Sequence, residues 1–163
     1  MAARLSAEHR RYIGGETLVA VVINALLSLA FALLTSHGVA VVPLWGVHGM
    51  ALDFAPQVFM VTFATTLAIT LVARARVRSG KAAPLGRERG GLLAWGSRNA
   101  FLRAVIFGLT ATLILAPISA GALYELGRDS LLSQQFIIMK VVYGALLAAV
   151  IAPSIARAAL TLS

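Results

Sequence analysis

Apolar stretches of similar length alternate with short polar segments along the chain. They cover residues 17–35, 54–73, 104–124 and 134–156, with Lys140 as the one charged side chain inside them. About 20 helical residues, each rising ~1.5 Å, cross the ~30 Å hydrocarbon core of a bilayer. The pattern therefore predicts an all-α integral membrane protein in which a single domain of four transmembrane helices spans about residues 16–36, 54–74, 101–124 and 133–156.

Composition supports a membrane protein and excludes cysteine chemistry. Hydrophobic residues make up 60% of the 163 residues, and charged residues only 12%. A soluble domain of this size would carry about twice that charged fraction. The chain has no cysteine, so disulfides, thiolate metal sites and cysteine nucleophiles are excluded.

The cations are distributed unevenly between the two sides of the predicted bundle. Of 14 Lys and Arg, three precede the first apolar segment, eight lie in residues 74–103 and one follows the last segment, whereas residues 36–56 contain none. Such a bias places the basic segments in the cytoplasm. We therefore expect cytoplasmic N- and C-termini, a basic cytoplasmic loop at residues 75–100, and a multi-pass protein of a bacterial inner membrane.

The net charge of +8 does not require a nucleic-acid partner, because lipid head groups explain the same charges. The expected partners are the bilayer and its anionic head groups. The residues predicted to contact head groups are Arg74, Arg76, Arg78, Lys81, Arg87 and Arg89.

Small residues recur at every fourth position in two of the apolar segments. They are Gly144, Ala148 and Ala152 in the last segment, and Gly108 and Thr112 in the third. Residues four apart lie on one face of a helix, and small side chains let helices approach closely in lipid. These positions are therefore predicted to form helix contacts.

The first apolar segment carries a polar stripe. Thr17, Asn24, Ser28 and Thr35 follow one another at spacings of seven, four and seven residues, which place them on one side of a helix. We interpret this stripe as a seam between helices, with Ser28 among its contact residues.

Lys140 lies on the same small-residue face, one step before Gly144. Its ammonium group either reaches back to the interface along its flexible stem or is held between helices by an anion. Asp53, Glu125 and Asp129 are the carboxylates on the same side of the predicted bundle. Asp53 is the expected partner, because it is predicted to start a helix while the other two lie in a loop.

The segments that flank the apolar stretches give further expectations. Gly14 and Gly15 are expected to end any short helix in the polar N-terminal segment. The apolar loop at residues 36–56 is expected to lie on the bilayer surface or to fold back onto the bundle. Asp53 with Pro56 is predicted to begin the second helix, and Ser97 to cap the third.

The two halves of the chain have the same layout of basic segment, apolar segment, loop and apolar segment. The second apolar segment of each half opens with a Gln-x-Phe motif, at Gln57 and at Gln134. Both halves would enter from the cytoplasm, so a repeat would be parallel. Two consecutive hairpins would give the same topology without a common origin.

No arrangement of residues predicts catalysis, a cofactor or a metal. The six acids and three histidines are scattered over both sides of the predicted bundle, whereas an active site needs converging groups. His48 and Asp53 supply only two candidate metal ligands. No glycine-rich nucleotide-binding motif follows a predicted strand.

Two functional hypotheses remain in view, with a third that is weaker. The leading one is an accessory inner-membrane protein that packs with itself or with a larger complex through its small-residue faces. The competing hypothesis is a small oligomeric transporter or channel in which Lys140 lines a polar cavity. The third is a sensor that uses the basic loop on anionic lipid.

Overall fold

The computed structural model describes residues 6–47, 49–83 and 99–161. In this part of the chain the elements are α1 (Ala7–Thr35), β1 (Val41–Pro43), α2 (Met50–Arg78), α3 (Ala100–Glu125), β2 (Ser130–Leu132) and α4 (Ser133–Thr161). All four helices are long and apolar enough to cross a membrane. The prediction of an all-α protein with four helices of membrane-spanning length is therefore confirmed, and the helices indicate an integral membrane protein.

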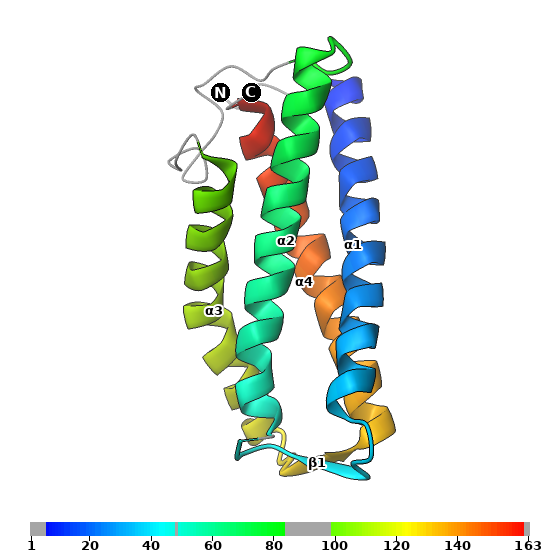
Figure 1. Cartoon of the computed structure of the whole chain (residues 1–163), viewed down its shortest axis with the longest axis vertical. Coiled ribbons are helices and arrows are strands. Elements are labelled where there is room, and N and C mark those ends of the chain that lie inside the picture. Colours follow the sequence, from blue (N-terminus) through cyan, green and yellow to red (C-terminus); the bar gives the residue numbers. More distant parts are fainter. Residues whose placement is uncertain (1–5, 48, 84–98, 162–163) are drawn as a thin grey trace.

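The helices alternate in direction, so their ends form two groups (Figure 1). The starts of α1 and α3 and the ends of α2 and α4 lie at one end of the bundle, and the strands lie at the other. Helix α1 packs along α4, α3 packs along α2, and α2 packs against α4. The same set of helix contacts results when α1 is exchanged with α3 and α2 with α4, so the two halves of the chain have equivalent positions in the bundle.

Helices α1 and α2 make few contacts with each other, although the chain connects them directly. Consecutive elements are usually neighbours in space. Here α1 lies on α4 instead, because the small residues on the facing sides of α1 and α4 permit a closer approach. A seam bounded by α1 and α2, with α4 behind it, follows from this arrangement (Figure 1).

A two-stranded ladder joins the two hairpin connections at one end of the bundle. Strands β1 and β2 pair antiparallel, with Val42 opposite Leu131. The Leu44 amide extends this pairing by donating to the Asp129 carbonyl at 2.7 Å. Each strand has only three residues, so the alternation of apolar and polar residues in the sequence is too short to predict a strand.

The apolar loop at residues 36–56 folds back onto the bundle in part. Val42 and Leu44 are buried against Met50 and Phe136. Trp45 remains exposed at its edge, with its ring 6.5 Å from that of Tyr124. The buried half closes the end of the bundle, while the exposed half presents apolar side chains at the level where α1 and α3 end.

The expected break at Gly14 and Gly15 is wrong, because α1 runs through both glycines from Ala7. Two glycines inside a helix cost about 1 kcal/mol each relative to alanine. The Ser6 side chain offsets part of this cost by accepting a hydrogen bond from the His9 amide at 3.2 Å. The helix therefore extends beyond the apolar segment.

The predicted start of the second helix at Asp53 and Pro56 is also wrong. Helix α2 begins at Met50 with Gly49 as its N-cap, so Asp53 lies in the first turn and Pro56 inside the helix. A Cβ atom at position 49 would lie only 2.6 Å from the Trp45 carbonyl carbon. Glycine is therefore needed for the tight turn that allows the earlier start.

The N-cap of α3 is Asn99, whose side-chain oxygen accepts a hydrogen bond from the Phe101 amide at 3.0 Å. This residue takes the role that the sequence suggested for Ser97, which lies outside the described residues. Both residue types are good N-caps, so local chemistry alone did not distinguish them. His48 and the loop positions Arg87 and Arg89 also lie outside the described residues.

Candidate functional site

The structure brings Lys140 of α4 and Asp53 of α2 into contact. The Lys140 Nζ atom lies 2.6 Å from Asp53 Oδ2, and the lysine side chain is only 3% exposed. The ammonium group also lies 5.3 Å from the centre of the Phe136 ring, within cation–π range. The ammonium group therefore lies between helices, and the lysine side chain does not extend to the end of the bundle.

Gln57 links this charge pair to α1. Its Nε2 atom donates to the Lys140 carbonyl at 2.9 Å and to Ser28 Oγ at 3.3 Å. Gln57 is one helical turn after Asp53, so both residues lie on the same side of α2. Residues from α1, α2 and α4 thus meet at one level of the bundle.

A second polar contact joins α1 and α2 nearer the other end of the bundle. Asn24 Nδ2 donates to Thr65 Oγ1 at 2.9 Å and to the Ala20 carbonyl at 2.8 Å. The Asn24 Oδ1 and Gln57 Oε1 atoms are buried and accept no hydrogen bond from described residues. An unpaired buried acceptor costs about 1–3 kcal/mol.

A cavity of about 180 Å³ lies between these two polar contacts, in the seam between α1 and α2. Both members of the charge pair line it, and its other walls are largely apolar, from Leu27 and Phe31 of α1 and Met60 of α2. An apolar pocket with a few fixed polar groups is the usual form of a small-molecule site.

A second cavity of about 460 Å³ adjoins the first at the strand end of the bundle. Both cavities are lined by Thr35, Asp53 and Pro56. The Asp53 carboxylate therefore lies at the junction between them. The two cavities extend from the strand end to the level of Asn24.

Most of the predicted packing residues are buried in contacts between helices of the same chain. A Cβ atom on Gly144 would overlap the Ser28 hydroxyl and lie 3.1 Å from Ser28 Cβ, so α4 and α1 are in close contact there. Ala148 and Ala152 continue this face and are fully buried. These small residues are therefore occupied by contacts within the chain.

The other predicted packing pair lies between α3 and α2. A Cβ atom on Gly108 would approach the Phe59 ring to 2.9 Å, so the glycine allows the aromatic ring to pack on the α3 backbone. Thr112 is only partly buried, and its hydroxyl donates to the Gly108 carbonyl at 2.8 Å. Thr112 thus bonds within its own helix.

The predicted head-group residues that the structure describes lie at the end of the bundle opposite the strands. Arg76 is paired with Glu16 of α1 at 3.4 Å, and its guanidinium lies 5.1 Å from the Tyr12 ring centre. Arg78 and Lys81 are exposed, and Arg74 is partly buried. The Glu16 contact, which sequence reasoning missed, joins α1 and α2 at this end.

Arg103 is a further residue that sequence reasoning missed, because it was counted with the basic segment before α3. The side chain is buried, and its Nη2 atom donates to Thr70 Oγ1 on α2. Its Nε and Nη1 atoms have no hydrogen-bond partner among the described residues. The flanking sequence Phe101-Leu102 and Ala104-Val105 was the available signal that this arginine points into the bundle.

Within the described residues, no group of three or more His, Asp or Glu side chains is placed to hold a metal ion. No protein-family model, curated protein or solved structure matches the chain. The interpretation of the site therefore depends on the geometry around Asp53 and Lys140.

Proposed function

We propose that the protein is a small membrane transport protein without catalytic activity, whose substrate site is the cavity beside Asp53 and Lys140. The single observation that carries the proposal is that this buried charge pair lines a cavity. Ionisable groups inside membrane helices are costly and commonly mark substrate or ion pathways. A pair with a purely structural role would be expected to be covered by packed side chains.

The chemistry of the cavity suggests the class of substrate. Its walls are apolar, and its charged groups lie at the end toward the strands. A small organic molecule with an apolar body and one charged or hydrogen-bonding group would match both features. Such a group would take the place of one partner in the Asp53–Lys140 pair.

The contact between Asn24 and Thr65 is proposed as the closed gate of this path. It connects α1 and α2 beyond the inner end of the cavity. Opening toward the other end of the bundle requires α1 and α2 to separate there, and the few contacts between these helices favour such a movement.

An accessory role in a larger membrane complex, or self-association, is the second candidate. It was suggested by the small-residue faces, but Gly144, Ala148 and Gly108 are occupied by contacts within the chain. A partner would therefore have to bind elsewhere. The exposed side chains at the strand end, including Trp45 and Val47, are the surface that favours this role.

Thiol labelling tests the transport proposal directly, because the natural chain has no cysteine. Leu27 and Leu26 are neighbouring exposed residues of α1, with exposed fractions of 44% and 61%, and of the two only Leu27 lines the cavity beside Asp53 and Lys140. In bilayers, Leu27→Cys is expected to react with a charged, membrane-impermeant thiol reagent at least about tenfold faster than Leu26→Cys. A tenfold ratio of the labelling rates corresponds to a difference of about 1.4 kcal/mol in the free energy of exposing the thiol to the reagent.

Both variants have nearly the same depth in the bundle, so depth alone gives them equal rates. Equal slow labelling of both cysteines would reject a water-accessible cavity and favour the accessory role. The Lys140→Met variant in the Leu27→Cys background should slow the reaction with an anionic reagent, since it removes a cation that lines the same cavity.

The membrane orientation is also a proposal, with both termini and residues 75–100 in the cytoplasm of a bacterial cell. It is supported by the bias of the cations toward one end. Reporter domains fused after Lys81 and after Gly127 are expected to lie on opposite sides of the inner membrane, with the Lys81 fusion inside. Fusions that report the same side would contradict this topology.

A parallel repeat of the two hairpins remains a proposal as well. It is supported by the helix contacts, which are unchanged when the halves are exchanged. The proposal concerns origin only, and the transport mechanism does not depend on it.

A further inference from the structure

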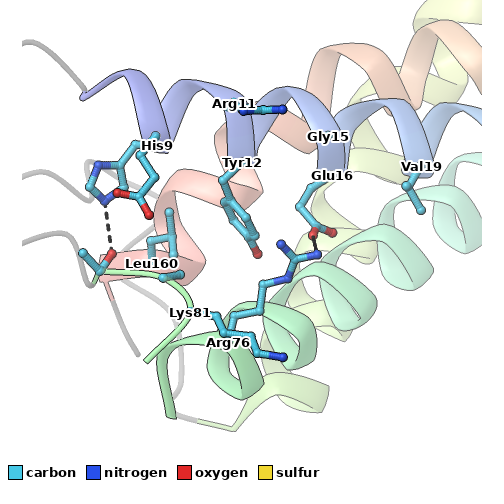
Figure 2. Close-up of a pocket in the computed structure, with 12 residues that line it drawn as sticks. His9, Arg11, Tyr12, Gly15, Glu16, Val19, Arg76, Lys81 and Leu160 are labelled. Atoms are coloured by element: carbon cyan, nitrogen blue, oxygen red, sulfur yellow. Dashed lines mark hydrogen bonds and ion pairs between the residues drawn. The ribbon is translucent and has the colours of Figure 1, made fainter. Parts of the chain in front are cut away.

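A third cavity, of about 380 Å³, lies at the end of the α1–α2 seam opposite the strands. Its walls are the α1 residues from Glu8 to Val19, Arg76 near the end of α2, residues 81–83 and Leu160 of α4. Figure 2 shows Tyr12 and Glu16 extending from α1 toward Arg76. The cavity is separate from the Asp53–Lys140 site.

The depth of this cavity corresponds to the head-group level of a membrane. On α1 the exposed large apolar side chains begin at Leu18, and on α2 they end at Val72. The cavity lies mainly beyond both positions, where the charged side chains begin. Val19 and Leu160 give it an apolar side, so a bound molecule meets apolar and charged walls together.

Both signs of charge line the cavity. The cations are Arg11, Arg76 and Lys81, and the carboxylates are Glu8 and Glu16. Among the described residues only Glu16 and Arg76 form an ion pair here. Arg11, Lys81 and Glu8 are exposed and have no ion pair within the described part of the chain, so two cations and one carboxylate are available to a ligand.

The backbone around Gly15 leaves room for the ligand beside these charges. A Cβ atom on Gly15 would meet no other atom within 4 Å. At the far side, the His9 ring and the Ala83 carbonyl are within hydrogen-bond distance at 3.1 Å and close the cavity between α1 and the end of α2 (Figure 2). Val19, which lines the cavity on the side of the apolar segment of α1, is exposed.

We infer that this cavity binds the head group of a phospholipid that carries a phosphate and a primary ammonium group. The phosphate is bound by Lys81 and Arg76, and the ammonium by Glu8 and Glu16. An acyl chain passes along Val19 into the lipid. A trimethylated ammonium group cannot donate hydrogen bonds to the carboxylates, and a head group without an amine leaves Glu8 without a partner.

Native mass spectrometry of the full-length protein in mild detergent tests this inference. The probes are phosphatidylethanolamine, phosphatidylcholine and phosphatidylglycerol with identical acyl chains. Thermal stabilisation of the protein by each lipid is measured as well, in about 150 mM salt, which screens unspecific electrostatic attraction. Phosphatidylethanolamine is expected to bind about fivefold more tightly than either of the other lipids, as expected for one additional charged contact near the surface.

Charge-removing variants locate the site. Lys81→Gln and Glu8→Gln are each expected to lose about fivefold in phosphatidylethanolamine affinity. The matched controls Arg128→Gln and Glu125→Gln, which remove exposed charges near the strand end, are expected to bind as the natural chain does. All four positions are exposed, so the variants should fold.

Equal binding of the three lipids would overturn the inference. Tighter binding of phosphatidylglycerol than of phosphatidylethanolamine would also overturn it, because attraction of the phosphate by the cations would then account for the binding without the carboxylates. Wild-type affinity in both Lys81→Gln and Glu8→Gln would place the lipid elsewhere. None of these results bears on the cavity beside Asp53 and Lys140, which lies nearer the opposite end of the seam.

Discussion

Replacing Gly144 by leucine is expected to destabilise the bundle by at least about 3 kcal/mol. Overpacking of a well-packed core costs about 1–3 kcal/mol, and more when the backbone must move. Here the first added carbon already overlaps the Ser28 hydroxyl. Helices α1 and α4 would therefore have to separate, and the Ser28–Gln57 hydrogen bond would be lost with them.

The measurement is thermal or denaturant-induced unfolding of the purified protein in mild detergent, followed by circular dichroism. Gly121→Leu on α3 is a matched control, because a Cβ atom at that position meets nothing within 4 Å. It should leave stability unchanged or raise it slightly, since leucine favours helix over glycine. Equal stability of the two leucine variants would show that α1 does not contact Gly144.

A compensating change sharpens this test. Gly144→Ala adds only the first carbon and should cost less than leucine, and Ser28→Gly removes both side-chain atoms that this carbon would meet. The double variant is therefore expected to be more stable than the sum of the single effects predicts. Strict additivity would mean that the two positions are not in contact.

Replacing Lys140 by methionine is the second change with a large expected effect. Removing one partner of a fully buried ion pair costs about 3–5 kcal/mol, because the other charge is left without compensation. The cost should be lower here, since 22% of the Asp53 side chain remains exposed. Helices α2 and α4 would lose their charged contact, and Gln57 would keep its bond to the residue 140 backbone.

A double-mutant cycle isolates the contribution of the pair. Asp53→Asn in the Lys140→Met background removes the stranded carboxylate, so the double variant should be at least about 1 kcal/mol more stable than additivity predicts. Unfolding midpoints of the natural chain, both single variants and the double variant give the coupling energy. A coupling energy near zero would indicate that the two side chains do not interact in the membrane protein.

Periodic patterns in the sequence predicted a large part of the fold. Apolar segments of about 20 residues located the four helices, and the spacing of four residues identified the Gly144 and Ala148 face. The position of Asp53 on the same side of the bundle as Lys140 suggested the pairing that the structure contains. These features depend on helix geometry within short segments, which is why a single sequence shows them.

Features that depend on distant segments were not predictable in the same way. The Glu16–Arg76 pair joins residues 60 positions apart, and the packing of α1 on α4 instead of α2 depends on the match of two surfaces. The start of α2 at Met50 follows from the close approach of Gly49 to the Trp45 backbone. The cavities result from these long-range contacts, so no local pattern indicates them.

The most direct test of the account is a solid-state NMR measurement of the contact between Lys140 and Asp53 in bilayers. The chain has two lysines, Lys81 and Lys140, and two aspartates, Asp53 and Asp129. With ¹⁵N at lysine Nζ and ¹³C at aspartate Cγ, one lysine signal should show strong dipolar coupling, as expected from the 2.6 Å contact. The coupling should vanish in Asp53→Asn, whereas two uncoupled lysine signals in the natural chain would contradict the proposed site.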